Sequence, residues 1–110
     1  MDLATKFAIQ RIIDDAWQIA EDHGWHDVPT EDGTQLALIH SEISEALQAL
    51  RDGSPPDKHI PEMDAVTVEL ADAVIRIFDF CQNKKLKLSD AIDAKMEFNK
   101  TRPYRHGKEF

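Results

Sequence analysis

Residues 63–83 constrain the fold of this chain more than any other segment. Apolar side chains surround nearly the whole circumference of the helix that their spacing predicts, and such a helix is normally buried. After Asp64 at its start, its charged side chains fall in a single strip that consists of Glu69, Asp72, Arg76 and Asp79. A buried helix with an acidic strip needs compensating positive charge, because an uncompensated buried carboxylate is very costly.

Two further helices are expected before this segment. Apolar residues recur at helical spacing over residues 3–21, and Gly24 follows as a suitable stop. A second apolar stripe predicts a helix over residues 34–51, with Thr30 as an alternative start. The glycine and adjacent prolines after it predict a loop to about residue 61.

A fourth helix is expected near the end of the chain. Ser89 is a good N-cap, and Pro103 disfavours helix at the residue before it, so this helix should end near Arg102. The 110 residues are enough for one domain and too few for two. We therefore expect a single all-α domain over residues 1–110, a four-helix bundle whose core a second copy of the chain completes.

Composition restricts the partners and the compartment. The formal net charge of −8 argues against a nucleic-acid backbone as partner, although divalent cations would let an acidic protein hold a polyphosphate. No apolar run approaches the length of a membrane span, and the first residues lack the pattern of a signal peptide. The single cysteine, Cys81, lies among apolar residues and is expected to be a buried thiol. These features predict a cytoplasmic protein without a membrane partner.

The second helix carries a pair of glutamates, Glu42 and Glu45, that can face the acidic strip of residues 63–83. Glu42 is flanked by apolar residues on the helical wheel, which a purely solvated acidic face would not show. Ion pairing with Arg76 is one way to compensate the charge, but one arginine cannot neutralise all these carboxylates. Hard divalent cations are the other, and we favour them.

Other site chemistries lack their residues. The four glycines are isolated, so no phosphate-binding glycine loop is present. No histidine has a glutamate three residues before it, which excludes the ligand pattern of a di-iron bundle. One cysteine cannot build a cysteine-rich zinc site. The remaining possibility is an all-carboxylate site, which favours Mg²⁺ or Mn²⁺.

Two other groups of residues suit a nucleotide. Lys95, Asn99 and Arg102 share one face of the fourth helix and suit an oxyanion such as phosphate, with a solvated basic face as the alternative. The loop over residues 23–33 carries Trp25 and two histidines, and is a candidate for small-molecule contact. The alternative is that Trp25 only fills the edge of the core.

Three segments resemble the MazG-like family of all-α nucleoside triphosphate pyrophosphohydrolases. Residues 36–47, with Glu42-x-x-Glu45, resemble the first half of the family motif, and Glu69-Leu70-Ala71-Asp72 resembles the second. Residues 95–104 resemble the Lys-x-x-x-Asn-x-x-Arg element near the C-terminus of family members. One departure is Ser41, where the family often has a further glutamate.

The resemblance implies a fold, a reaction and roles for residues. Family members are helical dimers or tetramers that cleave (d)NTPs to monophosphate and pyrophosphate. The resemblance implies that Mg²⁺ binds to Glu42, Glu45, Glu69 and Asp72, and that Lys95, Asn99 and Arg102 contact the phosphates. One of the four carboxylates can act as the general base, and we choose Glu45 because it lies farther from the main apolar stripe of its helix. The resemblance also points to a base pocket formed by the first helix and the following loop, with Trp17, His23, Trp25 and His26 as candidates and Tyr104 as a further one.

Two other functions stay open on the sequence. One is a non-catalytic helical dimerisation module whose carboxylate strip is ion-paired. The other is a related hydrolase that acts on a nucleoside diphosphate or a phosphoribosyl-nucleotide.

Overall fold

The computed structural model describes all 110 residues and contains four α-helices and no β-strand. The elements are α1 (Leu3–Asp22), α2 (Asp32–Arg51), α3 (Ala65–Asn83), α4 (Leu88–Lys100) and a short 3₁₀ turn, η1 (Tyr104–Gly107). The predicted all-α class is confirmed. None of the helices combines the length and the apolar composition that crossing a membrane requires.

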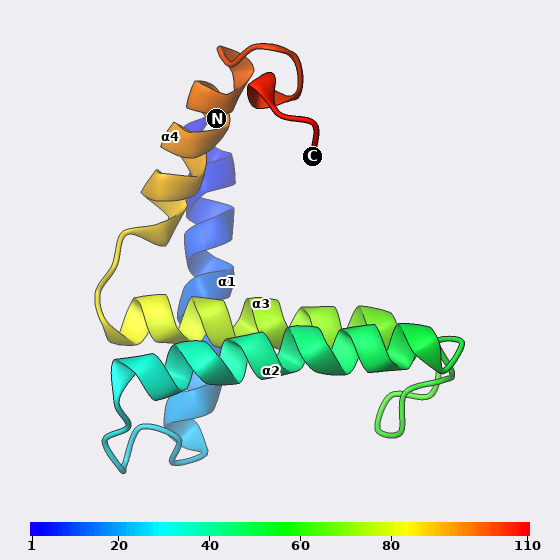
Figure 1. Ribbon diagram of the computed structural model, residues 1–110. Helices are drawn as coiled ribbons and strands as arrows, with labels where there is room; N and C mark the ends of the chain where they lie inside the picture. The colour runs from blue at the N-terminus through cyan, green and yellow to red at the C-terminus, as the bar shows by residue number, and fades with distance from the viewer.

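The apolar helix α3 is the centre of the fold. α2 lies antiparallel beside it, and α1 crosses behind this pair (Figure 1). α4 runs along the first half of α1 and points away from α2 (Figure 1). α3 contacts all three other helices, so the acidic strip that it carries is placed against the rest of the molecule.

Side-chain caps mark the start of two helices, α1 and α3. The carboxylates of Asp2 and Asp64 accept hydrogen bonds from backbone N–H groups of the first turns of α1 and α3. The predicted N-cap role of Ser89 is wrong, because α4 already begins at Leu88. The buried hydroxyl of Ser89 instead donates to Oε1 of Gln10 in α1, at 3.0 Å.

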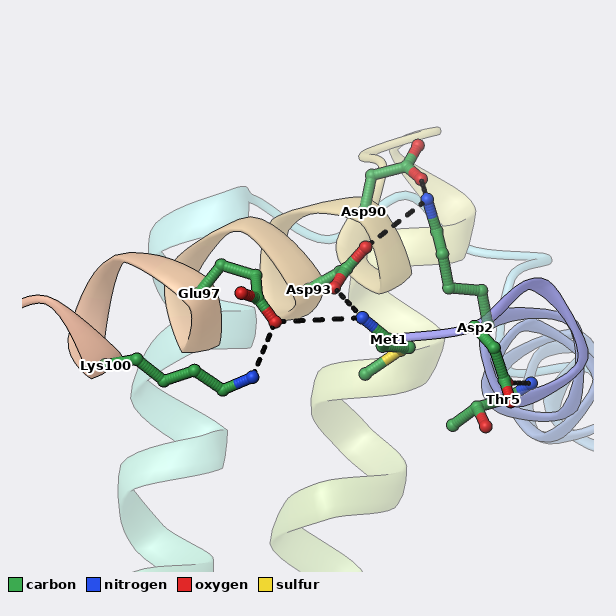
Figure 2. A network of polar contacts seen from close by, with 8 residues as sticks. Met1, Asp2, Thr5, Asp90, Asp93, Glu97 and Lys100 are labelled. Atoms are coloured by element: carbon green, nitrogen blue, oxygen red, sulfur yellow. Dashed lines mark hydrogen bonds and ion pairs between the residues drawn. The ribbon is translucent and has the colours of Figure 1, made fainter.

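Polar contacts hold α4 against α1. Lys6 of α1 places its Nζ atom 2.7 Å from Oδ1 of Asp90 and 3.8 Å from Oδ2 of Asp93. The amino group of Met1 lies 3.0 Å from Asp93 as part of the same network (Figure 2). Gln10 donates through Nε2 to Gln82 of α3 at 3.1 Å, which ties the end of α3 to this pair.

One chain alone leaves much apolar surface exposed. Only eight residues are buried, among them Cys81 as predicted, and Ile13 is the one large side chain that is fully buried. The prediction that α3 is buried is wrong within one chain, because Leu70, Val74 and Ile75 keep 44–50% of their surface exposed. The radius of gyration is 16.3 Å, whereas a compact domain of this length has about 13 Å. The open arrangement of the helices therefore leaves these side chains without a packing partner.

Candidate functional site

Three carboxylates from two helices lie close together between α2 and α3, with Glu42 buried, Glu69 half-buried and Asp72 exposed. Glu42 of α2 and Glu69 and Asp72 of α3 each offer an oxygen, and these oxygens lie within 4.8 Å of one another. The three-residue spacing puts Glu69 and Asp72 on one face of α3, and the antiparallel pairing with α2 brings Glu42 to that face. The structure thus brings together three of the four carboxylates singled out in the sequence.

The fourth carboxylate, Glu45, lies beside Glu69 and raises the pKa of its side chain. Burial raises the pKa of Glu69, and the neighbouring Glu45 and Glu42 carboxylates raise it further, to about 7. The pKa of Asp72 is also raised, mainly by burial and by the charge of Glu42, against the opposing effect of Arg76. Negative charge is therefore concentrated here beyond what the chain itself compensates.

Arg76 is the one cation of the chain that pairs with this group. Its Nε atom donates to Oε1 of Glu42 at 2.9 Å, and the Glu42 side chain is 10% exposed. No ion pair joins Arg76 to Glu69 or Asp72. Ion pairing thus accounts for one carboxylate, and the remaining oxygens form a hard, all-carboxylate donor set that suits Mg²⁺.

A cavity of about 970 Å³ opens beside the carboxylates, between α1, α2, α3 and the loop after α1. Glu42, Asp72 and Arg76 form part of its wall. Apolar side chains such as Ile12, Leu38 and Ile75 form another part, together with aromatic residues of the loop. A charged end and an apolar body suit a ligand that is itself charged at one end.

The predicted base-contacting residues are only partly brought to this cavity. His23, Trp25 and His26 line it, whereas Trp17 lies behind His26 with the two rings stacked, their centroids 5.2 Å apart. Nε1 of Trp17 donates to Oδ1 of Asn83 in α3 at 3.1 Å. Tyr104 is 91% exposed and lines neither this cavity nor the smaller one described below.

His26 is held between two carboxylates that its sequence neighbourhood does not reveal. Its Nδ1 atom lies 2.5 Å from Glu21 and its Nε2 atom 2.8 Å from Asp79 of α3. Burial lowers the pKa of His26, but the two hydrogen bonds and charges outweigh it and raise the pKa above the ordinary value. Asp79 was visible in the acidic strip, seven residues after Asp72, but only the fold reveals its partner.

The predicted phosphate-contacting face lies apart from the carboxylates within one chain. Lys95, Asn99 and Arg102 line neither cavity, and α4 packs along α1 rather than along α2. Lys95 and Arg102 instead flank the ring of Phe98, at 4.9 Å and 5.6 Å from its centroid. Oδ1 of Asn99 is buried without a hydrogen-bond partner.

A second, smaller cavity of about 330 Å³ lies on the other side of the carboxylate group. Glu45 and Glu69 line it together with the loop that joins α2 to α3.

Comparisons with protein-family models, curated proteins and solved structures find nothing similar to this chain.

Proposed function

We propose that this protein is a magnesium-dependent nucleoside triphosphate pyrophosphohydrolase with a MazG-like fold. The observation that carries the proposal is the meeting of Glu42, Glu69 and Asp72 within 4.8 Å at the wall of a cavity of about 970 Å³. The volume of this cavity is within the usual range for small-molecule sites. The arrangement of the motif residues on two antiparallel helices supports the resemblance seen in the sequence.

Glu42, Glu69 and Asp72 are the proposed Mg²⁺ ligands, with Glu45 next to them. When bound, Mg²⁺ would offset the charge of the triphosphate and make an attacking water more acidic. The raised pKa of Glu69, about 7, is expected where carboxylates are crowded without a cation. A divalent cation is a better counter-charge for this group than Arg76, which reaches only Glu42.

The proposed reaction cuts the bond between the α-phosphorus and the oxygen that bridges to the β-phosphorus. The oxygen of a water molecule forms a bond to the α-phosphorus, and a carboxylate takes the proton of that water. We assign this proton to Glu45, which lies beside Glu69 and has no ion pair with Arg76. The products are a nucleoside monophosphate and pyrophosphate.

The larger cavity is the proposed place of the nucleoside. Its wall carries the rings of Trp25 and His26 next to apolar side chains of the helices. Aromatic rings offer stacking surface to a nucleobase. The role of Trp17 is to hold the ring of His26 by stacking on it.

A second copy of the chain completes the proposed fold. The accessible surface of one chain is 8469 Å², about 2,300 Å² more than a compact protein of 12.5 kDa exposes. Burial of this excess on each chain corresponds to a permanent homodimer interface. We propose that a dimer or tetramer covers the apolar faces, and that Lys95, Asn99 and Arg102 reach the phosphates of a substrate bound mainly by another copy.

One assay tests the proposed reaction. The protein is incubated with each (d)NTP and Mg²⁺, and monophosphate, pyrophosphate and single phosphate are measured. We expect equal amounts of monophosphate and pyrophosphate. Release of single phosphate, or of nothing, would overturn the proposal.

Two matched variants complete the test. Glu69→Gln should lose the activity and the thermal stabilisation by Mg²⁺, whereas Glu62→Gln should keep both, because Glu62 is exposed and lines neither cavity. Absent hydrolysis together with a melting temperature that Mg²⁺ does not change would instead favour a non-catalytic module, with the Arg76–Glu42 pair as its charge compensation.

A further inference from the structure

The loop between α2 and α3, residues 52–64, has a fixed shape that the sequence does not suggest. Its central residue, Asp57, is 9% exposed. Oδ2 of Asp57 accepts hydrogen bonds from the backbone N–H groups of His59 and Ile60, both at 2.9 Å. The backbone N–H of Asp57 donates to the carbonyl oxygen of Met63 at 2.9 Å. The loop is therefore closed on itself around one buried carboxylate.

This shape sets a lysine and a histidine side chain at the edge of the carboxylate group. Lys58 and His59 line the smaller cavity together with Glu45 and Glu69. Neither side chain makes a hydrogen bond or an ion pair within the chain. The charge of His59 acts on Asp72 and lowers its pKa, against the larger effects that raise it. These side chains thus face a concentration of negative charge and have no fixed partner of their own.

The two cavities beside the carboxylates differ in the types of residue that line them. Glu42 and Asp72 line the larger cavity, whose wall is rich in apolar and aromatic side chains. Glu45 and Glu69 line the smaller cavity, whose other lining residues are mostly polar or charged and include Asp52, Asp57 and, as the only lysine, Lys58. A nucleoside suits the first environment, and a polyphosphate bridged to carboxylates by a divalent cation suits the second.

We propose that the smaller cavity holds the pyrophosphate end of the substrate, with Lys58 and His59 of the 52–64 loop as its direct contacts. This inference rests on the proposed function and adds an orientation to it. The nucleoside lies between α1, α2 and α3, the α-phosphate lies over the carboxylates, and the β- and γ-phosphates lie against the loop. Asp57 is then a positioning residue, because it acts only through the backbone of the loop.

Binding of magnesium pyrophosphate tests the inference directly. Calorimetry compares the whole protein with two variants that remove one lysine charge each, Lys58→Met in the loop and Lys85→Met in the turn after α3. Lys85 is exposed and lines neither cavity. We expect Lys58→Met to weaken binding about tenfold or more, the usual cost of one charged hydrogen bond, and Lys85→Met to leave it unchanged. Both lysines are exposed, so both variants should fold, with an unchanged melting temperature as the check.

The orientation predicts a difference between the two products. Lys58→Met should weaken inhibition by pyrophosphate and leave inhibition by nucleoside monophosphate unchanged. The inference is overturned if the parent protein does not bind magnesium pyrophosphate, or if Lys58→Met binds it as tightly as the parent.

The inference and the proposed function fail in different measurements. Hydrolysis that persists while Lys58→Met binds pyrophosphate normally would leave the proposed function standing and remove the loop from it. If pyrophosphate binding depends on Lys58 but the protein hydrolyses no (d)NTP, the proposed binding site stands and the proposed reaction is overturned.

Discussion

Arg76 donates through its Nε atom to Oε1 of Glu42 at 2.9 Å, and it does so from the same helix that carries Glu69 and Asp72. The arginine comes four residues after Asp72, so it lies one helical turn further along the acidic strip. It therefore compensates Glu42 of α2 and leaves the two carboxylates of its own helix without a cation. A divalent ion and Arg76 would then share the charge of Glu42.

Removal of Arg76 should destabilise the protein without Mg²⁺ more than with it. Arg76→Met leaves the carboxylate of Glu42, whose side chain is 10% exposed, without its partner. We expect a loss of about 1–2 kcal/mol in the free energy of unfolding, because the arginine is partly exposed. Mg²⁺ should restore most of the loss by taking over the counter-charge. Urea unfolding with and without Mg²⁺ measures both effects.

The control for this variant is Arg51→Met at the exposed end of α2. It removes the same charge from a side chain that makes no ion pair, and should change stability little in either condition. If Mg²⁺ does not reduce the loss of unfolding free energy in Arg76→Met, then Mg²⁺ and Arg76 do not share the compensation of the Glu42 charge.

Glu69 should make the Mg²⁺-free protein less stable as the pH rises. Folding raises its pKa from 4.5 to about 7, so between these values the folded chain binds more protons than the unfolded chain. The loss of folding stability caused by ionised Glu69 is absent below about pH 4.5 and complete above about pH 7. Glu69→Gln, which cannot ionise, should therefore melt several degrees above the parent at pH 8, and the difference should vanish near pH 4.5. Melting curves across this range test the prediction.

With Mg²⁺ at pH 8, the parent should melt at a higher temperature than Glu69→Gln, because Mg²⁺ binds the ionised form of the carboxylates. The parent should gain stability from Mg²⁺ at pH 8 and much less at pH 5, and Glu69→Gln should gain little at either pH. If Glu69→Gln melts below the parent at pH 8 without Mg²⁺, crowding of negative charge does not destabilise the protein at Glu69.

His26 should stabilise the protein most at low pH. Its folded-state pKa is raised above 6.5, so its contribution is complete below that value and is lost as the pH rises through the folded-state pKa. His26→Asn should reduce the free energy of unfolding by about 1 kcal/mol at pH 5.5, and by less at pH 9. Unfolding at both pH values measures the difference, and His40→Asn, which removes an exposed histidine without a hydrogen bond, is the control. A cost independent of pH would mean that stacking on Trp17 is the main role of the ring.

Local chemistry and helical spacing made much of the fold predictable. Gly24 ends α1 with a φ of +80°, a conformation that glycine adopts without strain. The meeting of Glu42 with Glu69 and Asp72 followed from the apolar neighbours of Glu42 and from the three-residue spacing on α3. Each of these inferences uses the residue pattern of a single helix, or of two helices that pack through their apolar faces.

Contacts between distant positions were beyond the reach of the sequence. Ser89 donates to Gln10, 79 residues away, in place of the cap that its position in the chain suggested. The placement of Lys95 depends on the direction in which α4 leaves α3, through a turn where Lys85 has a φ of +58°. The shape of the 52–64 loop depends on the burial of Asp57, which no periodicity marks. Such features arise from packing angles and loop closure, which single residues do not encode.

The apolar stripe of α2 should be the place where two chains meet. Ile43, Leu47 and Leu50 share one face of this helix and keep 50–62% of their surface exposed in a single chain. Leu47→Lys puts a charge in the middle of the stripe and should shift the protein from dimer or tetramer to monomer in sedimentation, with a lower melting temperature. Glu62→Lys, an exposed polar position outside the helices, should leave the assembly intact. A parent protein that sediments as a monomer would show that solvent covers this face, and would exclude a site completed by Lys95 of another copy.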